Sequence, residues 1–504
     1  MSSDKIISVY ADDQESSEQN DLFQKRHEVC EFIKEKTEVT IVVIAYNRPE
    51  VTRLCIESLL KYTNGINYKL ALVYNDNPGN EDILEYFNTV EYQNKVVMHI
   101  SRNAGAAFAY QQIMKYVEGK YIVHLPNDVI VTPNWLNNLI KCAESDIRIG
   151  MVNPVSSNVS NLQQVNLKFN NYEEMQDEAR KFNISDPKKW SERLRLITLA
   201  TLFKRECLSI VGDIFDPGFA HNFGDDDITF RVRRAGYKAI LAEDTWVHHD
   251  HKRDNMSYED AEKYNENLMI GRNHFREKYY GIDAWDDVNN FIPEILPHIR
   301  KPDNDKCTVL GIDVRCGTPI LEIKNQLRKQ DVFDTECCAA TFEGKYFIDL
   351  QTICGADNVV TCSAVEVSDN FPPKAFDYII IGENINGYSE PYKVIKNAYS
   401  LLKKGGNLYF YLKNTYDIYQ FLNVIGNRDV RPEKFAYNIP VETFIEDLNT
   451  MRINSEIIGV VPYYNLPVEF IQEINNKIDI LKKDKWEETS ARLTMDKIIV
   501  KLSL

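Results

Sequence analysis

Four apolar, β-branched runs in the first 130 residues constrain the fold of this chain more than any other feature. Each run is followed by a turn signal or a segment with helical character, and the runs lie at Val39–Ile44, Leu70–Tyr74, Lys95–Ile100 and Tyr121–Leu125. Strands that alternate with helices at this spacing form a largely parallel sheet, because a parallel connection has to cross over the sheet. The sequence therefore predicts an α/β fold for the first half.

A second α/β series begins after a polar, proline-containing stretch at residues 296–306. At 504 residues the chain exceeds what a single hydrophobic core usually fills. We therefore expect an extension over 1–36, partly disordered and then helical, a first domain over 37–295, a linker over 296–306 and a second domain over 307–504. Further strands are expected at Lys345–Leu350, Tyr378–Ile381, Asn407–Leu412 and Lys497–Leu502.

The charge balance restricts the classes of partner. Lys and Arg number 59 against 75 Asp and Glu, a formal net charge of −16. Nucleic acid and anionic membranes attract basic surfaces, so neither is an expected partner. No apolar run is long enough to span a bilayer, and no basic-then-apolar leader opens the sequence. The ten cysteines form no CxxC pair, which favours reduced thiols and a cytoplasmic location.

Carboxylates and histidines occur at the ends of the apolar runs. Asp76 and Asp128 each follow an expected strand, the run Asp225–Asp227 lies about a hundred residues further on, and His248 and His249 follow another apolar stretch. Ligands collect beyond the carboxyl ends of the strands in such sheets. Hard oxygen donors and an imidazole can hold Mn²⁺ or Mg²⁺, with Asp128 and one histidine as ligands. A carboxylate of the acidic run can accept a proton.

Each of these residues also has a purely structural interpretation. Asp76 can form a turn, and Asp128 can cap the helix that begins near Trp135. The acidic run can be a solvated loop, or the first turn of a helix whose dipole favours carboxylates. The two histidines can be an exposed strand end. Their joint occurrence in this order favours the functional interpretation.

In its motifs, the segment from about 38 to 275 resembles the family 2 glycosyltransferases, which have the GT-A fold. The matching stretches are Val39–Pro49, Tyr74–Pro78, Arg102–Gly105, Leu125–Leu136, Gly224–Tyr237 and Val247–His249. The resemblance implies a GT-A-type nucleotide-sugar-binding domain that inverts the anomeric carbon in a single displacement.

The resemblance also implies residue roles. The metal-binding motif of the family falls on Pro126–Asp128, where only the last carboxylate is present, with His249 or His248 as a second ligand. The catalytic pair falls on Gly224–Asp225, which makes Asp225 the expected base and Asp226 its rival. The donor-contacting positions match Ala45, Tyr46, Asn47, Arg48, Asp76, Asn103 and Asn127.

The second domain resembles a Rossmann-like class I S-adenosylmethionine methyltransferase. The resemblance rests on Leu310–Pro319, Phe376–Gly382 and Leu401–Phe410. Arg315 and Pro319 stand where that family usually has glycine, which allows backbone to approach the cofactor. Neither Glu336 nor Glu343 follows a convincing strand, although either can bind the cofactor ribose. We therefore expect a degenerate domain used for acceptor recognition or self-association, with S-adenosylmethionine binding as the alternative.

The expected activity is metal-dependent transfer of a sugar from a nucleotide-diphosphate donor, with UDP favoured, to a hydroxyl of a protein such as flagellin or of a surface glycan. Two alternatives remain open. One is a non-catalytic module that binds a glycan or another partner, and the other is a bifunctional glycosyl- and methyltransferase.

Overall fold

The computed structural model describes residues 37–219, 222–250, 258–302, 306–419, 438–463, 469, 472 and 492–504. The extension expected over 1–36 lies outside these residues. Among the described residues, no helix combines the length and the apolar character needed to cross a bilayer. The cysteines within these ranges are free thiols, in agreement with the absence of a disulfide framework.

The described residues form two compact units. The first contains 37–185, 197–219 and 235–250, and the second contains 186–196, 222–234 and the described residues from 258 onward. The units therefore interleave along the chain, instead of following one another across a single boundary near residue 300. The acidic run belongs to the second unit, whereas Asp128 and both histidines belong to the first.

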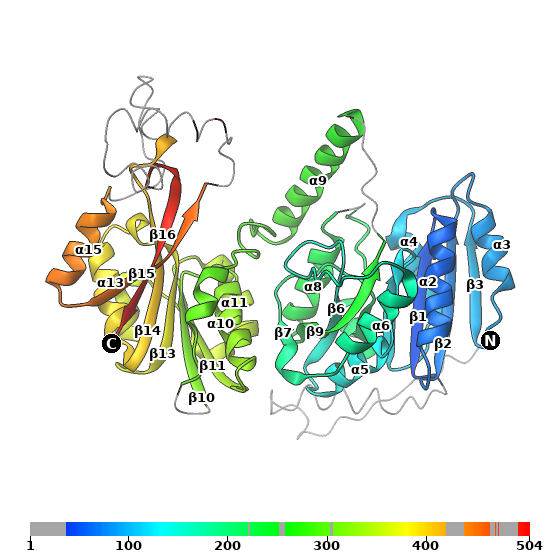
Figure 1. The fold of residues 1–504 in the computed structure, drawn as a ribbon, viewed down its shortest axis with the longest axis horizontal. Coiled ribbons are helices and arrows are strands. Elements are labelled where there is room, and N and C mark those ends of the chain that lie inside the picture. Colours follow the sequence, from blue (N-terminus) through cyan, green and yellow to red (C-terminus); the bar gives the residue numbers. More distant parts are fainter. Residues whose placement is uncertain are drawn as a thin grey trace, which may run out of the picture. The chain divides into compact units, whose positions relative to one another are not determined.

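The sheet of the first unit has the strand order β3-β2-β1-β4-β8-β6-β9-β5. Figure 1 labels β1, β2, β3, β6 and β9 of this sheet. The bounds are β1 Val39–Ala45, β2 Tyr68–Asn75, β3 Lys95–Ile100, β4 Tyr121–Pro126, β5 Val129–Ile130, β6 Ile149–Ser156, β8 Thr201–Lys204 and β9 Lys238–His249. Strands β3, β2, β1 and β4 run parallel, and β8 pairs antiparallel with β4 and β6. All four strands expected from the apolar runs are confirmed.

The helices of the first unit connect these strands. They are α2 Pro49–Tyr62, α3 Asp82–Thr89, α4 Gly105–Ile113 with the 3₁₀ turn η3 Met114–Tyr116, α5 Trp135–Glu144, α6 Tyr172–Phe182 and α7 Arg205–Val211. Helix α2 begins with a proline, whose missing N–H costs nothing in a first turn. Because β1, β2 and β4 are parallel, their carboxyl ends lie along one edge of the sheet, where the loops to α2, α3 and β5 begin.

The sheet of the second unit has the order β12-β11-β10-β13-β14-β16-β15. Its strands are β10 Lys306–Ile312, β11 Asp334–Thr341, β12 Val359–Thr361, β13 Phe376–Asn384, β14 Leu402–Lys413, β15 Asn454–Pro462 and β16 Met495–Ser503. The first five strands are parallel, and β16 pairs antiparallel with both β14 and β15. This is a Rossmann-like sheet with an antiparallel end, as the resemblance implied.

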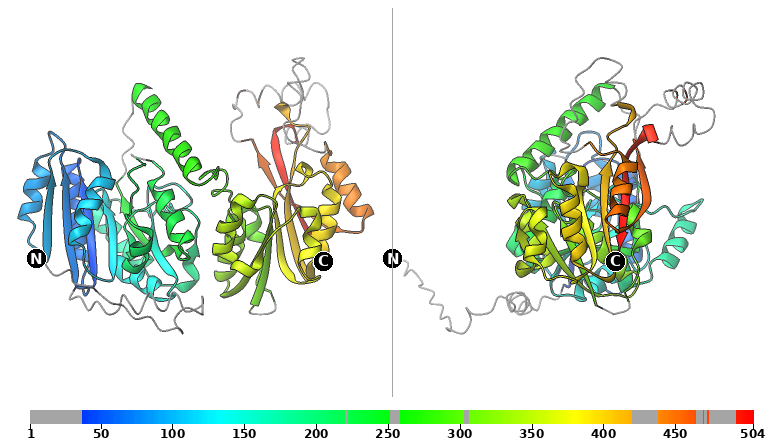
Figure 2. Two further views of the ribbon diagram at one scale, coloured as in Figure 1. Left: turned by 180° about the vertical axis from the view of Figure 1, so that it is seen from behind. Right: turned by 90° about the vertical axis from the view of Figure 1, so that its left-hand side faces the viewer.

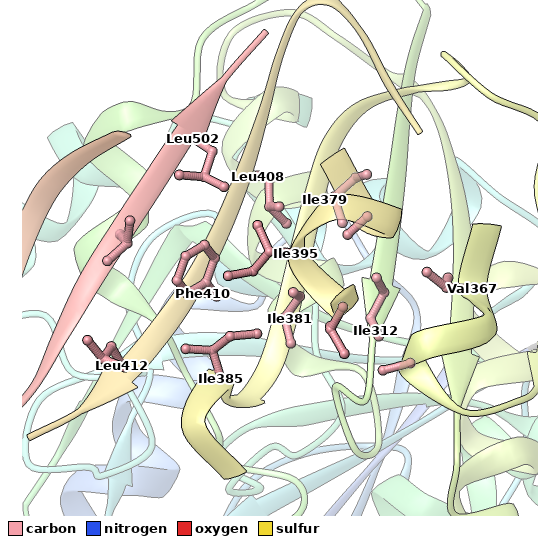
Figure 3. Close-up of a cluster of buried hydrophobic side chains, with 14 of the residues drawn as sticks. Ile312, Val367, Ile379, Ile381, Ile385, Ile395, Leu408, Phe410, Leu412 and Leu502 are labelled. Carbon is pink, nitrogen blue, oxygen red and sulfur yellow. The ribbon is translucent and has the colours of Figure 1, made fainter. Parts of the chain in front are cut away.

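The second unit also contains helices and short elements. They are η4 Pro187–Lys189, β7 Trp190–Glu192, α8 Gly224–Arg234, α9 Tyr258–Lys278, η5 Pro293–His298, α10 Thr318–Arg328, η6 Gly344–Tyr346, α11 Phe347–Cys354, η7 Ala356–Asn358, η8 Ala364–Glu366, α12 Val367–Asn370, η9 Ile385–Gly387, α13 Pro391–Ser400 and α15 Val441–Thr450. Both views of Figure 2 show the long helix α9. Figure 3 shows part of the apolar core, in which Ile312, Ile379 and Phe410 are fully buried.

One expected strand of the second domain is wrong. Residues 345–350 are not extended, because they form the end of η6 and the start of α11. The buried side chains of Tyr346 and Leu350 are four residues apart, which is the spacing of one helix face. Asp349 in the first turn also suits the positive end of the helix dipole.

Candidate functional site

A charged cluster lies in the first unit beyond the end of β4. Asp128 lies two residues beyond the end of that strand, and its backbone carbonyl accepts a hydrogen bond from the Asp250 amide at 2.9 Å. Arg48 precedes α2, and its guanidinium Nη2 donates to Asp250 Oδ1 at 2.9 Å. The Nη1 atom of Arg48 lies 3.5 Å from Asp128 Oδ2. One guanidinium therefore lies beside two carboxylates that are 122 residues apart in the chain.

His249 adds an imidazole to this cluster. Its Nδ1 lies 3.0 Å from the carbonyl oxygen of Asn158, and its Nε2 lies 3.5 Å from Asp128 Oδ2. A carbonyl oxygen only accepts, so Nδ1 carries the proton of this hydrogen bond. With Nδ1 carrying one proton, Nε2 can act in two ways: it donates to the Asp128 carboxylate when it carries a second proton, or it offers a lone pair to a cation that both side chains share.

The pKa of Asp128 is perturbed in this setting. Burial by itself raises the pKa, but contact with His249 and the positive charge of Arg48 outweigh it, so the pKa lies below the usual value for aspartate. Asp128 thus stays ionised, as a cation ligand must. The helix-cap interpretation of Asp128 is not supported, since Asn134 takes the N-cap position of α5 and the Asp128 carboxylate contacts Arg48 and His249.

His248 lies in a different environment. Its Nδ1 lies 2.9 Å from the Ser157 hydroxyl, and its ring packs edge-on against Phe169 with ring centroids 5.7 Å apart. Burial lowers its pKa. Successive side chains of a strand point to opposite faces, which separates His248 from its neighbour. The structure therefore brings His249, and not His248, to Asp128.

The donor set suits a divalent cation only in part. Within the described ranges, no group of three or more His, Cys, Asp or Glu side chains is arranged to hold a metal. Asp128 and His249 together supply one oxygen and one nitrogen. Mg²⁺ and related ions are often held by one or two protein ligands together with substrate phosphates. These two residues therefore fit a cation that arrives with a diphosphate.

The expected donor-contacting residues surround the same edge of the first sheet. Ala45 and Tyr46 lie at the end of β1, with Ala45 buried and Tyr46 exposed. The Asn127 amide donates to the Asn47 carbonyl at 2.9 Å and to the Thr52 hydroxyl at 2.8 Å. Asn127 thus ties the loop after β1 to the loop after β4, and this bracing fixes the backbone on either side of the cluster.

Asp76 and Asn103 follow the next strands of that sheet. Asp76 accepts a hydrogen bond from the Tyr74 hydroxyl at 3.0 Å, and His99 Nε2 lies 3.4 Å from its other oxygen. The side-chain oxygen of Asn103 accepts from the Asn75 amide at 2.9 Å. Both residues remain accessible, since Asp76 is half-buried and Asn103 is exposed.

The acidic run forms the first turn of α8 in the second unit, which was one of the structural alternatives. Asp227 is fully buried and accepts from Arg231 at 2.8 Å, Lys278 at 2.5 Å and the Tyr279 hydroxyl at 2.7 Å. Asp226 is buried against Arg195, and burial raises its pKa. Asp225 alone of the three is partly exposed.

The loop after β10 tests the methyltransferase-type site. Arg315 has a left-handed backbone, with φ of 54°, and its Nε donates to Glu383 at 2.8 Å while Nη1 donates to the Asp286 carbonyl at 2.7 Å. A Cβ on Gly311 would lie 2.6 Å from Ile320, so this glycine meets protein instead of a ligand. These residues do not fit a loop that cradles S-adenosylmethionine.

The expectation that Glu343 does not follow a convincing strand is wrong. Glu343 lies two residues beyond β11, at the carboxyl end of that strand, where a ribose-binding acid is placed in Rossmann-like folds. Its carboxylate lies 3.2 Å from the ammonium of Lys345. Glu336 is within β11 and pairs with Lys306 at 3.0 Å. Asp313, which follows β10, accepts from the Phe342 amide at 2.9 Å and the Tyr388 hydroxyl at 2.8 Å.

Sequence reasoning missed several residues that complete these clusters. Asp250 adjoins the two histidines in the sequence, and that position was the available signal. No sequence signal pointed to Arg195, Lys278 or Asp349, because the residues that they contact lie more than 30 positions away.

Comparison with known proteins agrees with the motifs. The sequence model described as Glycosyl transferase family 2 matches residues 40–194. The minor teichoic acid biosynthesis protein GgaB from Bacillus subtilis (strain 168) is 29% identical over 102 residues, which is 20% of this chain and 11% of that protein. The chain thus matches only about a tenth of the length of this relative.

Two solved structures have limited similarity to this chain. A mannosyltransferase from Pyrobaculum calidifontis, in complex with GDP-Man and Mn²⁺, is 15% identical with a TM-score of 0.37, covering 53% of this chain and 74% of that one. A SAM-dependent methyltransferase from Archaeoglobus fulgidus is 17% identical with a TM-score of 0.30, covering 46% of this chain and 98% of that one. The sequence model of glycosyl transferase family 2 thus matches residues 40–194, and the second half contains a Rossmann-like sheet.

Proposed function

We propose that this chain transfers a sugar, with inversion, from a nucleotide-diphosphate sugar to an acceptor hydroxyl. The observation that carries the proposal is the orientation of His249, whose Nε2 faces Asp128 beside Arg48 at the carboxyl edge of the first sheet. The family match over residues 40–194 supports the same reaction class.

Asp128 and His249 hold a divalent cation in this proposal, and Arg48 adds a fixed positive charge for the diphosphate. A bound cation neutralises the leaving diphosphate without requiring a proton. Asp76 and Asn103 contact the nucleoside, while the bracing by Asn127 keeps the loops after β1 and β4 in place. Ala45, Tyr46 and Asn47 line the start of the loop that receives the nucleotide.

Asp225 accepts the proton of the acceptor hydroxyl. The acceptor oxygen forms a bond to the anomeric carbon as the bond from that carbon to the phosphate oxygen breaks, and the nucleoside diphosphate leaves with the electron pair. Asp225 suits this role better than Asp226, because Asp226 is buried against Arg195. A base must reach the incoming hydroxyl directly or through one water.

The acceptor is a hydroxyl on a protein or on a surface glycan, and UDP is the favoured nucleotide. The name of the relative GgaB places that protein in teichoic acid biosynthesis, which supports a surface polymer as the acceptor class. We place the reaction in the cytoplasm, because its proposed donor is a nucleotide sugar.

Nucleotide release from a panel of nucleotide sugars, with and without Mn²⁺, tests the proposal. We expect one donor to be hydrolysed slowly in a metal-dependent manner. The Asp128→Ala variant should lose this activity, whereas Asp82→Asn, an exposed acid at the start of α3, should retain it. Asp225→Asn should bind the donor but lose transfer. Donor binding without any turnover in the wild type would favour the glycan-binding alternative.

A further inference from the structure

Helix α8 is held at its carboxyl end by one buried carboxylate of α11. Asp349 is fully buried, and its two oxygens accept from Nε and Nη2 of Arg234 at 3.1 and 2.8 Å. The Nη2 atom of Arg233 lies 3.6 Å from the same carboxylate, and the Arg233 side chain is 3% exposed. A single negative charge therefore balances two guanidinium groups in a largely dehydrated setting.

The remaining contacts of Arg233 are neutral. Its guanidinium donates to the Leu194 carbonyl at 3.3 Å and to the Thr352 hydroxyl at 3.4 Å. Without the Asp349 carboxylate, the two adjacent cations would repel each other and lose the one carboxylate that both contact. Breaking a buried ion pair on one side is costly for this reason. Asp349 thus determines whether the carboxyl end of α8 can stay in place.

The other end and the face of α8 are anchored to the same unit. Asp226 pairs with Arg195, and Asp227 accepts from Lys278 and Tyr279. Phe230 packs against Phe275 with ring centroids 5.0 Å apart. The helix is therefore a rigid rod whose orientation is set at both ends.

The partly exposed Asp225 lies at the amino end of this rod. It is nine residues from Arg234, or about 14 Å along a helix at ~1.5 Å per residue. Because the helix is rigid, release of its carboxyl end strains the contacts of Asp226 and Asp227 beside Asp225. A displacement of about 1 Å at the Asp225 carboxylate can reduce a catalysed rate by about a hundredfold.

We propose that Asp349 is a positioning residue, which holds α8 through Arg233 and Arg234 and so places Asp225 for proton acceptance. The methyltransferase-type domain then acts as the scaffold of the transferase base, with no need for S-adenosylmethionine. This inference rests on the proposed function, since Asp225 matters only if the chain transfers a sugar.

The test uses the full chain and the Asp349→Asn variant, which keeps the shape of the side chain and removes its charge. We expect kcat for transfer to fall by about thirtyfold while the KM for the nucleotide sugar changes less than about twofold, since only the base is displaced. Asp349→Glu should restore part of the lost kcat. The control is Asp357→Asn, an exposed acid just beyond α11, which should match the wild type.

A double-variant cycle separates positioning from general damage. In the Asp225→Asn background, Asp349→Asn should cause no further loss of the residual rate, because its effect passes through Asp225. An equal loss in both backgrounds, or a wild-type kcat for Asp349→Asn, would overturn the proposal. If Asp349→Asn does not fold, Arg234→Gln replaces it in the same cycle, with a fall in kcat of about tenfold expected and an unchanged kcat contradicting the proposal.

Hydrogen exchange gives a readout that is independent of turnover. The amides of 224–234 should exchange at least about tenfold faster in Asp349→Asn than in the wild type. If the wild type transfers no sugar from any donor, the proposed function fails, while exchange still reports whether Asp349 holds α8. If the amides of 224–234 exchange at the same rate in Asp349→Asn and in the wild type, Asp349 does not anchor α8, whether or not the chain is active.

Discussion

The Nε2 atom of His249 lies 3.5 Å from Oδ2 of Asp128, while the adjacent His248 contacts Ser157 and Phe169 instead. Two neighbouring histidines of one strand thus have different environments, although the sequence left them equivalent. His249 is therefore the histidine that we propose to share a cation with Asp128.

The two histidines should therefore respond differently to the same substitution. We expect His249→Gln to reduce Mn²⁺-dependent nucleotide release by about a hundredfold, because a metal ligand is lost, whereas substituting groups outside the site costs far less. His248→Gln should stay within about threefold of the wild type. Titration of the rate with Mn²⁺ measures both, and equal losses would contradict the assignment of His249.

Substitutions within the acidic run should differ in their effect on the free energy of unfolding. Asp227→Asn should lower the free energy of unfolding by about 3–5 kcal/mol, because Arg231 and Lys278 lose a buried counter-charge. Asp225→Asn should change it by less than about 0.5 kcal/mol, as is usual for accessible positions. Urea unfolding of the two variants provides the comparison. A similar loss for both would mean that Asp225 also has a structural role.

His124 should make the first unit sensitive to acid. Its Nδ1 shares a hydrogen bond with the Tyr110 hydroxyl. Burial lowers its pKa to about 4, although the negative charge of Asp128 opposes this. The unfolded chain binds a proton near pH 6.5, so the unfolded state gains protons first as the pH falls, and stability decreases between pH 6.5 and 4.

The shift corresponds to about 3 kcal/mol, at ~1.4 kcal/mol per pKa unit. Unfolding of His124→Gln should lack this part of the pH dependence, and above pH 6.5 the difference between variant and wild type should be constant. An unchanged slope in His124→Gln would contradict the burial of a neutral ring.

Calorimetric titration of the full chain with S-adenosylmethionine should show no saturation up to about 1 mM. The Kd would then exceed about 1 mM, which corresponds to a binding free energy weaker than ~4 kcal/mol. The reason is that Arg315 bridges Glu383 and Asp286 across the loop that would receive the cofactor. A micromolar Kd would instead support the bifunctional alternative, and methylation of the glycosylated product would then be the next measurement.

The strands of the first domain could be predicted because their signal is local. Val39–Ile44 is a continuous run of β-branched residues, and such runs indicate buried parallel strands. The misjudged segment at 345–350 also has a local pattern, but a short apolar run does not separate strand from helix by periodicity alone. There the spacing of Tyr346 and Leu350 was the better guide.

The different environments of the three aspartates in the acidic run could not be predicted from the sequence. Asp225, Asp226 and Asp227 are identical in type and adjacent in sequence. Their different environments depend on Arg195 and Lys278, which reach them only through the tertiary fold. The same holds for Asp349, whose contact with Arg234 joins residues 115 positions apart.

The placement of α8 within the second unit also limits how the chain can be divided. A truncation between residues 296 and 306 keeps Arg233 and Arg234 but removes Asp349, so both guanidinium groups would lose the carboxylate that they contact. We therefore expect that exchanging the second half for another Rossmann-like domain would require a matching acid on the equivalent helix.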